Sequence, residues 1–391
     1  MRLLNFLRNI KDRFFIRPLD YNLLRLEIDA DRLRKNIAFF KRHFKIPYLA
    51  VVLKSNAYGH GLKEISQLLD KNEEVSHFIV DSLMEAKILR NFNIKKDIII
   101  LGYLPSVTLP SLKKIKNVIL VVNSLNQAEL IKNLVDFPLK IHIKIDTGFH
   151  RQGIYLEELT TAILILQKNK NLKIEGLLSH LADAPNQNNL AAKQIQKWQE
   201  GVKIYKRNVA NCAHHFFHIL ATTGINYFSK INNNLVRLGA GIYGIDTTPE
   251  KNLSLEPVIS LWAKVVNIKR VKAGERVGYG FSWIADKDTK IAIIPCGYYE
   301  GVPRYLSNKG YFYYYDMPLK IVGKVCMNLT MVDVSDINGL KVEDEIEIIS
   351  NNPSKLNSVY KIAEMGQTIP LEVLTHFSLQ IRRVVKNKDN Y

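Results

Sequence analysis

Short apolar runs alternate with amphipathic stretches from Leu24 to about Asp246. Apolar runs of roughly 4–8 residues between turn residues are typical of buried strands, whereas apolar residues three and four positions apart are typical of helices. These patterns predict strands over residues 24–28, 49–53, 77–80, 97–101, 118–122, 139–145, 172–177 and 215–219. They predict a helix after Asp29, which can cap it, and helices over residues 82–91, 127–134, 156–167 and 189–208.

Regular alternation of strand and helix indicates parallel strands joined by crossover helices. About eight such units fit a closed barrel better than an open sheet. No Gly-x-Gly-x-x-Gly follows a predicted strand, so the sequence gives no support for a dinucleotide-binding sheet. We therefore expect an α/β fold in which a TIM-like (β/α)8 barrel occupies residues 18–246.

The pattern changes after Asp246, where short strands alternate with turns rather than with helices. We expect strands over residues 261–270, 290–294, 318–325, 331–334, 345–349 and 373–383. Residues 247–391 are thus expected to form a mainly β domain, whose first residues, 247–257, serve as the linker.

The first 17 residues form an extension of separate character. Leu3, Leu7, Ile10 and Phe14 recur at helical spacing with Arg and Lys between them. The segment lacks the long apolar centre and cleavage site of a signal peptide. Two interpretations stay open: a basic amphipathic helix that contacts a membrane surface, and a helix that packs on the protein or frays.

Composition narrows the class of protein. The 391 residues, 47% of them apolar and 24% charged, suit a globular protein of two domains. No run approaches the ~20 apolar residues of a transmembrane helix. The net charge of +18 comes without a nucleic-acid recognition motif, so we expect solvated surface lysines and no nucleic-acid partner, and a role in binding another anionic partner stays open as the alternative. Three scattered cysteines indicate a reducing, cytoplasmic setting and no metal site.

The most informative segment is residues 49–61, LAVVLKSNAYGHG. Five apolar residues lead directly into Lys54, and a turn rich in Asn and Gly follows. A lysine at the tip of a buried strand is held rigidly and partly desolvated, which favours its neutral amine. A neutral amine is the nucleophile that a Schiff base requires. Taken alone, a lysine in this position is more commonly a surface residue.

Other polar residues also follow predicted strands, and in a barrel the reactive groups lie at these strand ends. They are Tyr58 and His60, the segment Asp146-Thr147-Gly148-Phe149-His150-Arg151, Ser179-His180, Thr222-Thr223-Gly224, and Val236-Arg237-Leu238-Gly239-Ala240-Gly241. Each of these has an ordinary structural explanation when taken singly. Their joint placement predicts a single site.

The lysine segment resembles the pyridoxal-phosphate motif of alanine racemases, AVVKANAYGHG, with Ser55 in place of the alanine after the lysine. Further segments resemble that family in the same order, namely residues 144–151 with DTG and an arginine, His180, residues 236–239, VGYG at 277–280, GYYEGVPR at 297–304 for GYADGxPR, and GKVCMN at 323–328 for GxVCMD. The resemblance extends across nearly the whole chain from about Pro18. It implies a pyridoxal 5′-phosphate (PLP) enzyme that interconverts L-alanine and D-alanine and supplies D-alanine for peptidoglycan.

The resemblance also implies a role for each matched residue. Lys54 would bind the cofactor covalently and act with Tyr279 as one of two bases on opposite faces of the substrate. Arg237 would face the pyridine nitrogen, and because an arginine keeps its proton, that nitrogen would stay unprotonated. His180 would pack beside the ring. The phosphate would be held by Tyr58, Thr222, Gly239 and Ala240.

Three more residues would bind or surround the substrate. Arg151 would pair with its carboxylate, Lys144 would be carbamylated and orient Arg151, and Met327 would bound the pocket. In the family, the residues that match Tyr279 and Met327 reach the cofactor of another subunit. The resemblance therefore implies a head-to-tail homodimer with shared sites.

Several positions depart from the family pattern. Leu371 replaces a tyrosine near the pocket entrance, Asn328 replaces the aspartate after the methionine, and Ala221 replaces an asparagine before the phosphate-binding residue, here Thr222 instead of serine. None of these changes removes a proposed base. Two alternatives to an alanine racemase thus stay open: a racemase of another or broader range of amino acids, and a PLP-binding protein with little catalysis.

Overall fold

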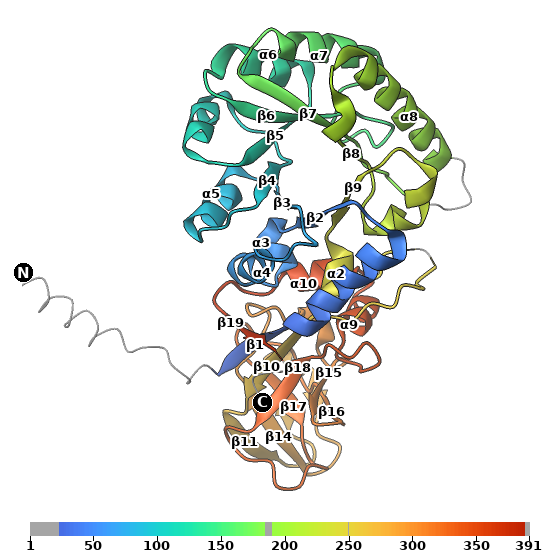
Figure 1. Ribbon diagram of the computed structural model, residues 1–391. Coiled ribbons are helices and arrows are strands. Elements are labelled where there is room, and N and C mark those ends of the chain that lie inside the picture. Colours follow the sequence, from blue (N-terminus) through green and yellow to red (C-terminus); the bar gives the residue numbers. More distant parts are fainter. Residues whose placement is uncertain (1–22, 184–189, 249, 388–391) are drawn as a thin grey trace, which may run out of the picture. The chain divides into compact units, whose positions relative to one another are not determined.

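The structure, a computed structural model, describes residues 23–183, 190–248 and 250–387. It divides into two compact units (Figure 1). The first unit is Asp29–Val258, and the second joins Ile259–Lys386 to the segment that ends at Ile28. The helix expected over residues 1–17 lies outside the described residues.

The first unit is an eight-stranded parallel barrel with helices around it. Its strands are β2 (Tyr48–Val52), β3 (His77–Val80), β4 (Asp97–Ile100), β5 (Val118–Val122), β6 (Leu139–Lys144), β7 (Leu172–Leu178), β8 (Phe216–His218) and β9 (Leu235–Leu238). Backbone hydrogen bonds from Asn234 N to Phe217 O (3.0 Å) and from Arg237 N to Leu220 O (3.1 Å) close the ring between β8 and β9. The barrel predicted from the sequence is confirmed.

Helices cover the outer face of the barrel, as α5 to α8 show in Figure 1. They are α2 (Ala30–Phe44), α4 (Leu62–Leu69), α5 (Leu83–Asn91), α6 (Leu125–Leu134), α7 (Leu159–Gln167) and α8 (Leu190–Asn208). Asp29 caps α2 as expected, because its Oδ1 accepts a hydrogen bond from Arg32 N at 2.9 Å. Leu33, Ile37 and Phe40 share the buried face of that helix.

The barrel encloses an apolar cluster and, on β6, a series of polar residues. The cluster includes Val52, Ile79, Ile99 and Val121 from β2 to β5, together with Leu178 of β7 and Leu235 of β9. On β6 every second residue is polar, giving the series Lys140, His142 and Lys144. Because alternate residues of a strand point to the same face, these three side chains line one column.

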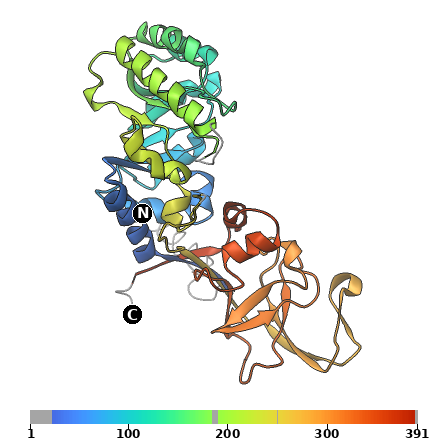
Figure 2. The same ribbon diagram turned by 90° about the vertical axis from the view of Figure 1, so that its right-hand side faces the viewer.

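The second unit is mainly β and contains a six-stranded sheet in the order β16-β15-β18-β10-β1-β19. Figure 2 shows this unit mostly in orange and red, the colours of the later part of the chain, whereas β1 has the blue of the early part. The strands of this sheet are β1 (Leu24–Asp29), β10 (Ile259–Lys264), β15 (Tyr311–Tyr314), β16 (Met317–Lys320), β18 (Glu345–Ile349) and β19 (Arg382–Lys386). A smaller sheet joins β11 (Asn267–Val271), β14 (Thr289–Ile294) and β17 (Thr330–Asp333), and a strand pair joins β12 (Arg276–Val277) to β13 (Trp283–Ile284).

Strand β1, the first in the described part of the chain, belongs to this second unit and not to the barrel. In β1, Leu24, Leu26 and Ile28 alternate with Arg25 and Glu27, and the strand pairs antiparallel with β10. Alternation of this kind is typical of an antiparallel sheet, whereas barrel strands read as continuous apolar runs. The barrel takes its eighth strand from β9, which the sequence pattern did not reveal because Arg237 interrupts it.

The segment expected as a linker, residues 247–257, is grouped with the barrel unit, which ends at Val258. One further expectation differs from the structure. The strand expected over residues 373–383 is absent there, since α9 (Val359–Met365) and α10 (Pro370–Thr375) precede β19. Pro370 stands at the first position of α10, where its missing N–H has no partner to lose.

Candidate active site

The carboxyl ends of the barrel strands bring most of the expected residues into one unit. Lys54 follows β2, Lys144 ends β6, His180 follows β7, Thr222 follows β8, and Arg237 lies in β9. Tyr279 and Met327 belong to the second unit. The barrel unit therefore carries the residues expected to bind the cofactor, and the second unit carries the expected second base.

Lys54 opens a short segment of left-handed backbone, α3 (Lys54–Tyr58). The φ angles of Ser55, Asn56, Ala57 and Tyr58 lie between 53° and 56°. A left-handed turn of L-residues costs roughly 1–2 kcal/mol per residue, so it persists only where surrounding contacts impose it. Such strain is typical of functional sites, and here it directly follows the candidate nucleophile.

A cradle for an anionic group is formed where α3 meets the end of β9. Gly239 leaves room for the Tyr58 hydroxyl, which lies only 2.5 Å from the point where a Cβ on Gly239 would stand. Burial raises the pKa of Tyr58 to about 12, so its hydroxyl is a neutral donor. Thr222 Oγ1 accepts from Gly241 N at 3.0 Å, which leaves the hydroxyl hydrogen free to donate. The added methyl of Thr222 relative to serine packs beside Gly241.

Arg237 is a buried cation surrounded by neutral groups. Its guanidinium donates to the carbonyls of Ser179 (2.8 Å), Ile219 (3.2 Å) and His218, and to Nδ1 of His218 (3.0 Å) and of His180 (3.2 Å). Burial lowers the pKa of Arg237 to about 10, so it remains charged at neutral pH. No carboxylate pairs with it among the residues that the structure describes.

Arg237 also fixes the tautomers of two buried histidines. Because arginine only donates, Nδ1 of His218 accepts and Nε2 of His218 carries the proton. That N–H lies 3.0 Å from Nδ1 of His142 and donates to it, which places the His142 proton on Nε2. Burial, then the charge of Arg237, lowers the pKa of His218 well below its usual value, and burial, then His77, does the same for His142. Both rings are therefore neutral.

Sequence reasoning missed His142 and His218 because both lie inside predicted strands. The signal was present in residues 140–144, where Lys, His and Lys occupy alternate positions of an otherwise apolar run. The His142 ring fills the space over Gly176, where a Cβ would stand 2.6 Å from it. A side chain at position 176 would therefore displace the ring.

These residues fit PLP by their donor chemistry. The phosphate is an anion, and two hydroxyl donors lie at the end of β9, namely Tyr58 against Gly239 and Thr222 beside Gly241. His180 is neutral, since burial, then the charges of Arg237 and Arg151, lowers its pKa to about 3. A neutral ring can lie against a flat heterocycle without charge repulsion. Arg237 can only donate hydrogen bonds, so it suits an unprotonated pyridine nitrogen of PLP, which can only accept one.

The expected carboxylate-binding loop is ordered around Asp146. Its Oδ1 accepts from the backbone N of Gly148 (2.8 Å), Phe149 (2.9 Å) and His150 (3.2 Å). The guanidinium carbon of Arg151 lies 4.1 Å from the centre of the Phe149 ring, and that ring lies 5.6 Å from the His180 ring. Phe149 thereby links Arg151 to the cofactor-binding residues.

Lys144 is a buried lysine among cations. Its side chain contacts Gln152 Oε1 at 3.3 Å. Burial, followed by the charges of Arg237 and Arg151, lowers the pKa of Lys144 to about 8. A substantial part of this lysine is therefore a neutral amine near pH 8, and a neutral amine is the form that adds carbon dioxide to give a carbamate.

The lowered pKa of Lys144 predicts a stabilising substitution. The unfolded chain binds this proton up to about pH 10.5 and the folded chain only up to about 8, so stability rises with pH across that window. Below pH 8 the full cost of burying the charged amine is present. In protein kept free of carbon dioxide, where Lys144 is an unmodified amine, Lys144→Met should therefore increase the free energy of unfolding by roughly 1–3 kcal/mol at pH 7. The gain should shrink by pH 10, as measured by denaturant unfolding.

Exposed Lys203 on α8 supplies the matched control, because Lys203→Met should show no such pH-dependent gain. A carbamate on Lys144 would reverse the sign, since an anion beside Arg151 stabilises the fold. Loss of stability in Lys144→Met at pH 7 would therefore contradict a free amine.

In the second unit, Tyr279 and Met327 lie on loops with 70% and 55% of their surface exposed. The Met327 turn is held against the loop that begins at Gly297, because Tyr299 N donates to Met327 O at 2.9 Å. Buried Glu300 accepts from Gly297 N (2.8 Å) and from the side-chain amide of Asn328 (2.7 Å). The two departures at positions 300 and 328 are thus coupled, since an aspartate at 328 would oppose Glu300.

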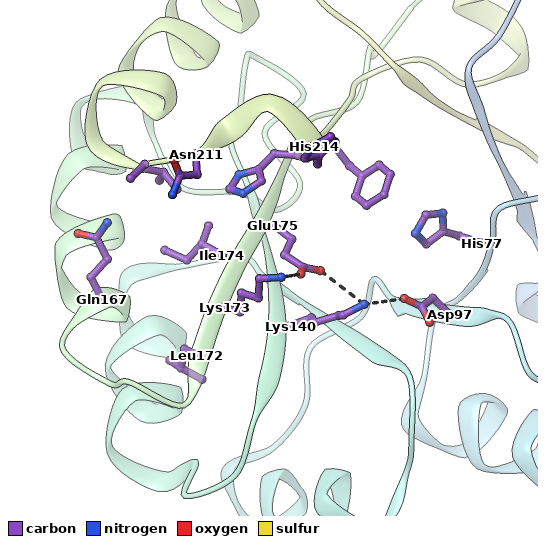
Figure 3. Close-up of a pocket in the computed structure, with 14 residues that line it drawn as sticks. His77, Asp97, Lys140, Gln167, Leu172, Lys173, Ile174, Glu175, Asn211 and His214 are labelled. Atoms are coloured by element: carbon purple, nitrogen blue, oxygen red, sulfur yellow. Dashed lines mark hydrogen bonds and ion pairs between the residues drawn. The ribbon is translucent and has the colours of Figure 1, made fainter.

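A cavity of about 570 Å³ lies at the amino ends of the barrel strands, away from Lys54 and the other candidate site residues (Figure 3). His77 and Asp97, which begin β3 and β4, help line it. Lys140 lies between Asp97 (2.9 Å) and Glu175 (3.6 Å), and the dashed lines in Figure 3 trace these ion pairs. Residues at this end of a barrel commonly serve stability, and the ion pairs already use the charges present.

The described residues contain no group of three or more His, Cys, Asp or Glu that could hold a metal ion. Within the same residues, no helix combines the length and apolarity needed to cross a membrane.

Comparison with known proteins agrees with this geometry. The model "Alanine racemase, N-terminal domain" matches residues 28–247, and "Alanine racemase, C-terminal domain" matches residues 258–385. An alanine racemase of Leptospira interrogans is 31% identical over 92% of this chain and 95% of its own length. The structure of a Clostridium difficile alanine racemase has a TM-score of 0.86 and 27% identity, covering 95% of this chain and 97% of the other.

A histidine racemase of Leuconostoc mesenteroides is similar to the same extent, with a TM-score of 0.85 and 26% identity over 94% of this chain and 99% of the other. The fold is thus shared by racemases of different amino acids. Both family models and the relative from Leptospira together cover nearly the whole chain. The chain belongs to the alanine racemase family of PLP-dependent amino-acid racemases.

Proposed function

We propose that this protein interconverts L-alanine and D-alanine and supplies D-alanine for peptidoglycan. The observation that carries the proposal is the set of groups at the carboxyl end of the barrel. Lys54 follows β2 there, and Arg237 lies in the adjoining strand β9 among neutral partners. A nucleophilic amine, an anion cradle and a buried cation without a carboxylate are the groups that a racemase needs to hold PLP.

Bound PLP withdraws electrons from Cα of the substrate and so acidifies its hydrogen. The Lys54 amine then accepts or returns a proton on one face of that carbon. Arg237 keeps its own proton, because a guanidinium does not deprotonate near neutral pH. It would donate to the pyridine nitrogen and so leave that nitrogen unprotonated, which would limit electron withdrawal and disfavour side reactions such as transamination.

Arg151 is proposed to bind the substrate carboxylate through its planar, two-pronged donor set. The Arg151 guanidinium stacks on Phe149, and Phe149 in turn contacts His180, so Arg151 is held on the same side of the site as His180. We also propose that Lys144 carries a carbamate, because its lowered pKa favours the neutral amine. The modification would turn a repelling cation into an anion that orients Arg151.

The second base is proposed to be Tyr279 from a second copy of the chain, with Met327 beside it. Exposed apolar side chains on neighbouring loops support this, namely Tyr279, Phe281, Tyr299, Met327 and Leu329. The loops adjoin one another, since a Cβ on Gly280 would lie 3.1 Å from Lys324 Nζ and Tyr299 N bonds to Met327 O. A contiguous apolar patch of this kind is typical of an interface between proteins. A homodimer would cover it.

A racemase of another amino acid is the second candidate. Two replacements in the second unit favour it. Leu371 lacks the hydroxyl of the family tyrosine, and Asn328, which replaces an aspartate, donates its side-chain amide to Glu300. A pocket wall without a free carboxylate there gives no attraction for a cationic substrate. Under this second candidate the substrate would be a larger or different uncharged amino acid, and lysine and arginine would be poor substrates.

A substrate panel tests this proposal. Purified protein with PLP should racemise L-alanine with a kcat/KM at least about 10-fold above those for serine, histidine, lysine and arginine, because a small pocket rejects added atoms. Chiral chromatography of each reaction measures both enantiomers. A higher kcat/KM for another amino acid would contradict alanine as the preferred substrate.

The third possibility, a PLP-binding protein with little catalysis, predicts a visible cofactor band with no turnover of any amino acid. Cys212, Cys296 and Cys326 are free thiols, which supports our proposal of a cytoplasmic enzyme.

A further inference from the structure

The left-handed turn after Lys54 is anchored to another element by a single carboxylate contact. Ser55 N, the first amide of the turn, donates to Oε1 of Glu85 at 2.8 Å. We propose that Glu85 is a positioning residue that fixes the direction of the Lys54 side chain, an inference that rests on the proposed role of Lys54 in binding PLP.

Glu85 divides its two oxygens between two tasks. Oε1 accepts from Ser55 N, and Oε2 accepts from the backbone N of Asp81 (2.9 Å) and Ser82 (3.1 Å). The second set belongs to the capping box of α5, in which Ser82 Oγ in turn accepts from Glu85 N at 3.2 Å. One carboxylate therefore joins the start of α5 to the residue that follows Lys54.

The anchored peptide matters because it joins Lys54 to Ser55. Hydrogen bonding of its N–H fixes the plane of that peptide and hence the direction in which the Lys54 side chain leaves the backbone. Several backbone hydrogen bonds run within the segment, as in Ala57 N to Leu53 O (2.7 Å) and Gly59 N to Ser55 O (3.1 Å). The later residues of the turn also contact other elements, since Asn56 Oδ1 accepts from Leu62 N at 2.8 Å and the Tyr58 ring packs on Tyr243. Glu85 binds the first amide of the turn, which is the one next to Lys54.

The fold offers a matched control. Ser82→Ala removes the hydrogen bond from Glu85 N to Ser82 Oγ and leaves the bonds that the Glu85 carboxylate accepts in place. Glu85→Ala removes the bonds from Ser55 N, Asp81 N and Ser82 N and keeps the Ser82 cap, so each variant removes one half of the capping box but only Glu85→Ala frees Ser55 N. Glu85→Gln has a single side-chain oxygen, so it can serve Ser55 N or the capping N–H groups but not both. If Glu85 acts only as a cap, the alanine variants at 82 and 85 should behave alike.

The first experiment follows condensation of Lys54 with PLP, which releases one water. Full-length protein is stripped of cofactor with hydroxylamine, PLP is added, and the visible band is followed by stopped flow. Glu85→Ala should form the band about 10-fold more slowly than wild type, since small misplacements of a reacting group are costly. Ser82→Ala should stay within about 2-fold of wild type, and Glu85→Gln should lie between the two.

Hydrogen exchange gives a second readout that needs no cofactor. In Glu85→Ala the amides of residues 55–61 should exchange faster than in wild type, and in Ser82→Ala they should not. Equal band formation and equal exchange in the two alanine variants would overturn the role of Glu85. If the wild-type protein shows no visible band with PLP, or shows the same band as Lys54→Ala, the proposed function is overturned together with this inference.

Discussion

Lys54→Ala should abolish the visible absorption band of the PLP-loaded protein and lower racemisation by about 10³- to 10⁴-fold. The expected loss is large because the variant lacks both the covalent link to the cofactor and one of the two bases. The Tyr58–Gly239 cradle and Arg237 remain intact, so PLP should still bind without the link. Absorption spectra and equilibrium dialysis with PLP measure the two effects separately.

Lys63→Ala supplies the control, because Lys63 is an exposed lysine on the neighbouring helix α4. It should keep the wild-type spectrum and rate. A Lys54→Ala protein with an unchanged band would show that another lysine binds the cofactor and would contradict the proposed site.

Tyr279→Phe should lower racemisation by about 10²- to 10⁴-fold while leaving proton exchange at Cα for one enantiomer. The two directions of racemisation must fall together, because the equilibrium between enantiomers is unchanged. In D₂O, however, the enantiomer whose hydrogen faces Lys54 should still exchange it without inversion. Mass spectrometry of recovered alanine measures this exchange. Loss of exchange from both enantiomers would contradict two independent bases.

Mixing the two inactive variants tests whether sites are shared between subunits. After random exchange of Lys54→Ala and Tyr279→Phe chains, about half of the dimers are mixed, and each mixed dimer holds one site with both bases. About a quarter of wild-type activity should therefore return. Sites built within one chain would give no recovery, because neither chain carries both residues.

The sequence predicted the barrel well because most of its strands are buried on both faces. Such strands read as apolar runs, as in residues 118–122, and their ends are marked by the polar residues that follow. The cofactor-binding positions were predictable for the same reason, since Lys54 and His180 stand directly after a run. The resemblance to a family then gave each of them an expected role, and these roles stay predictions until the variants are measured.

The missed features depend on contacts that no local pattern shows. Strand β9 is only four residues long and contains Arg237, whose charge is tolerated there because His218 and backbone carbonyls surround it. The contact between Ser55 and Glu85 joins residues 30 positions apart through one backbone N–H. Left-handed backbone at Ser55, Asn56 and Ala57 is equally invisible, since none of these residues is glycine.

The membership of β1 in the second unit has a consequence for how this protein is made. On the ribosome, residues 24–29 emerge before the barrel strands, whereas their neighbours in the sheet, β10 and β19, are synthesised only after the last barrel strand, β9. The strand must wait unpaired while the barrel folds, with its row of N–H and C=O groups open to other nascent chains. An expressed barrel fragment should accordingly begin at Asp29, because a longer one would retain an unprotected strand that promotes aggregation.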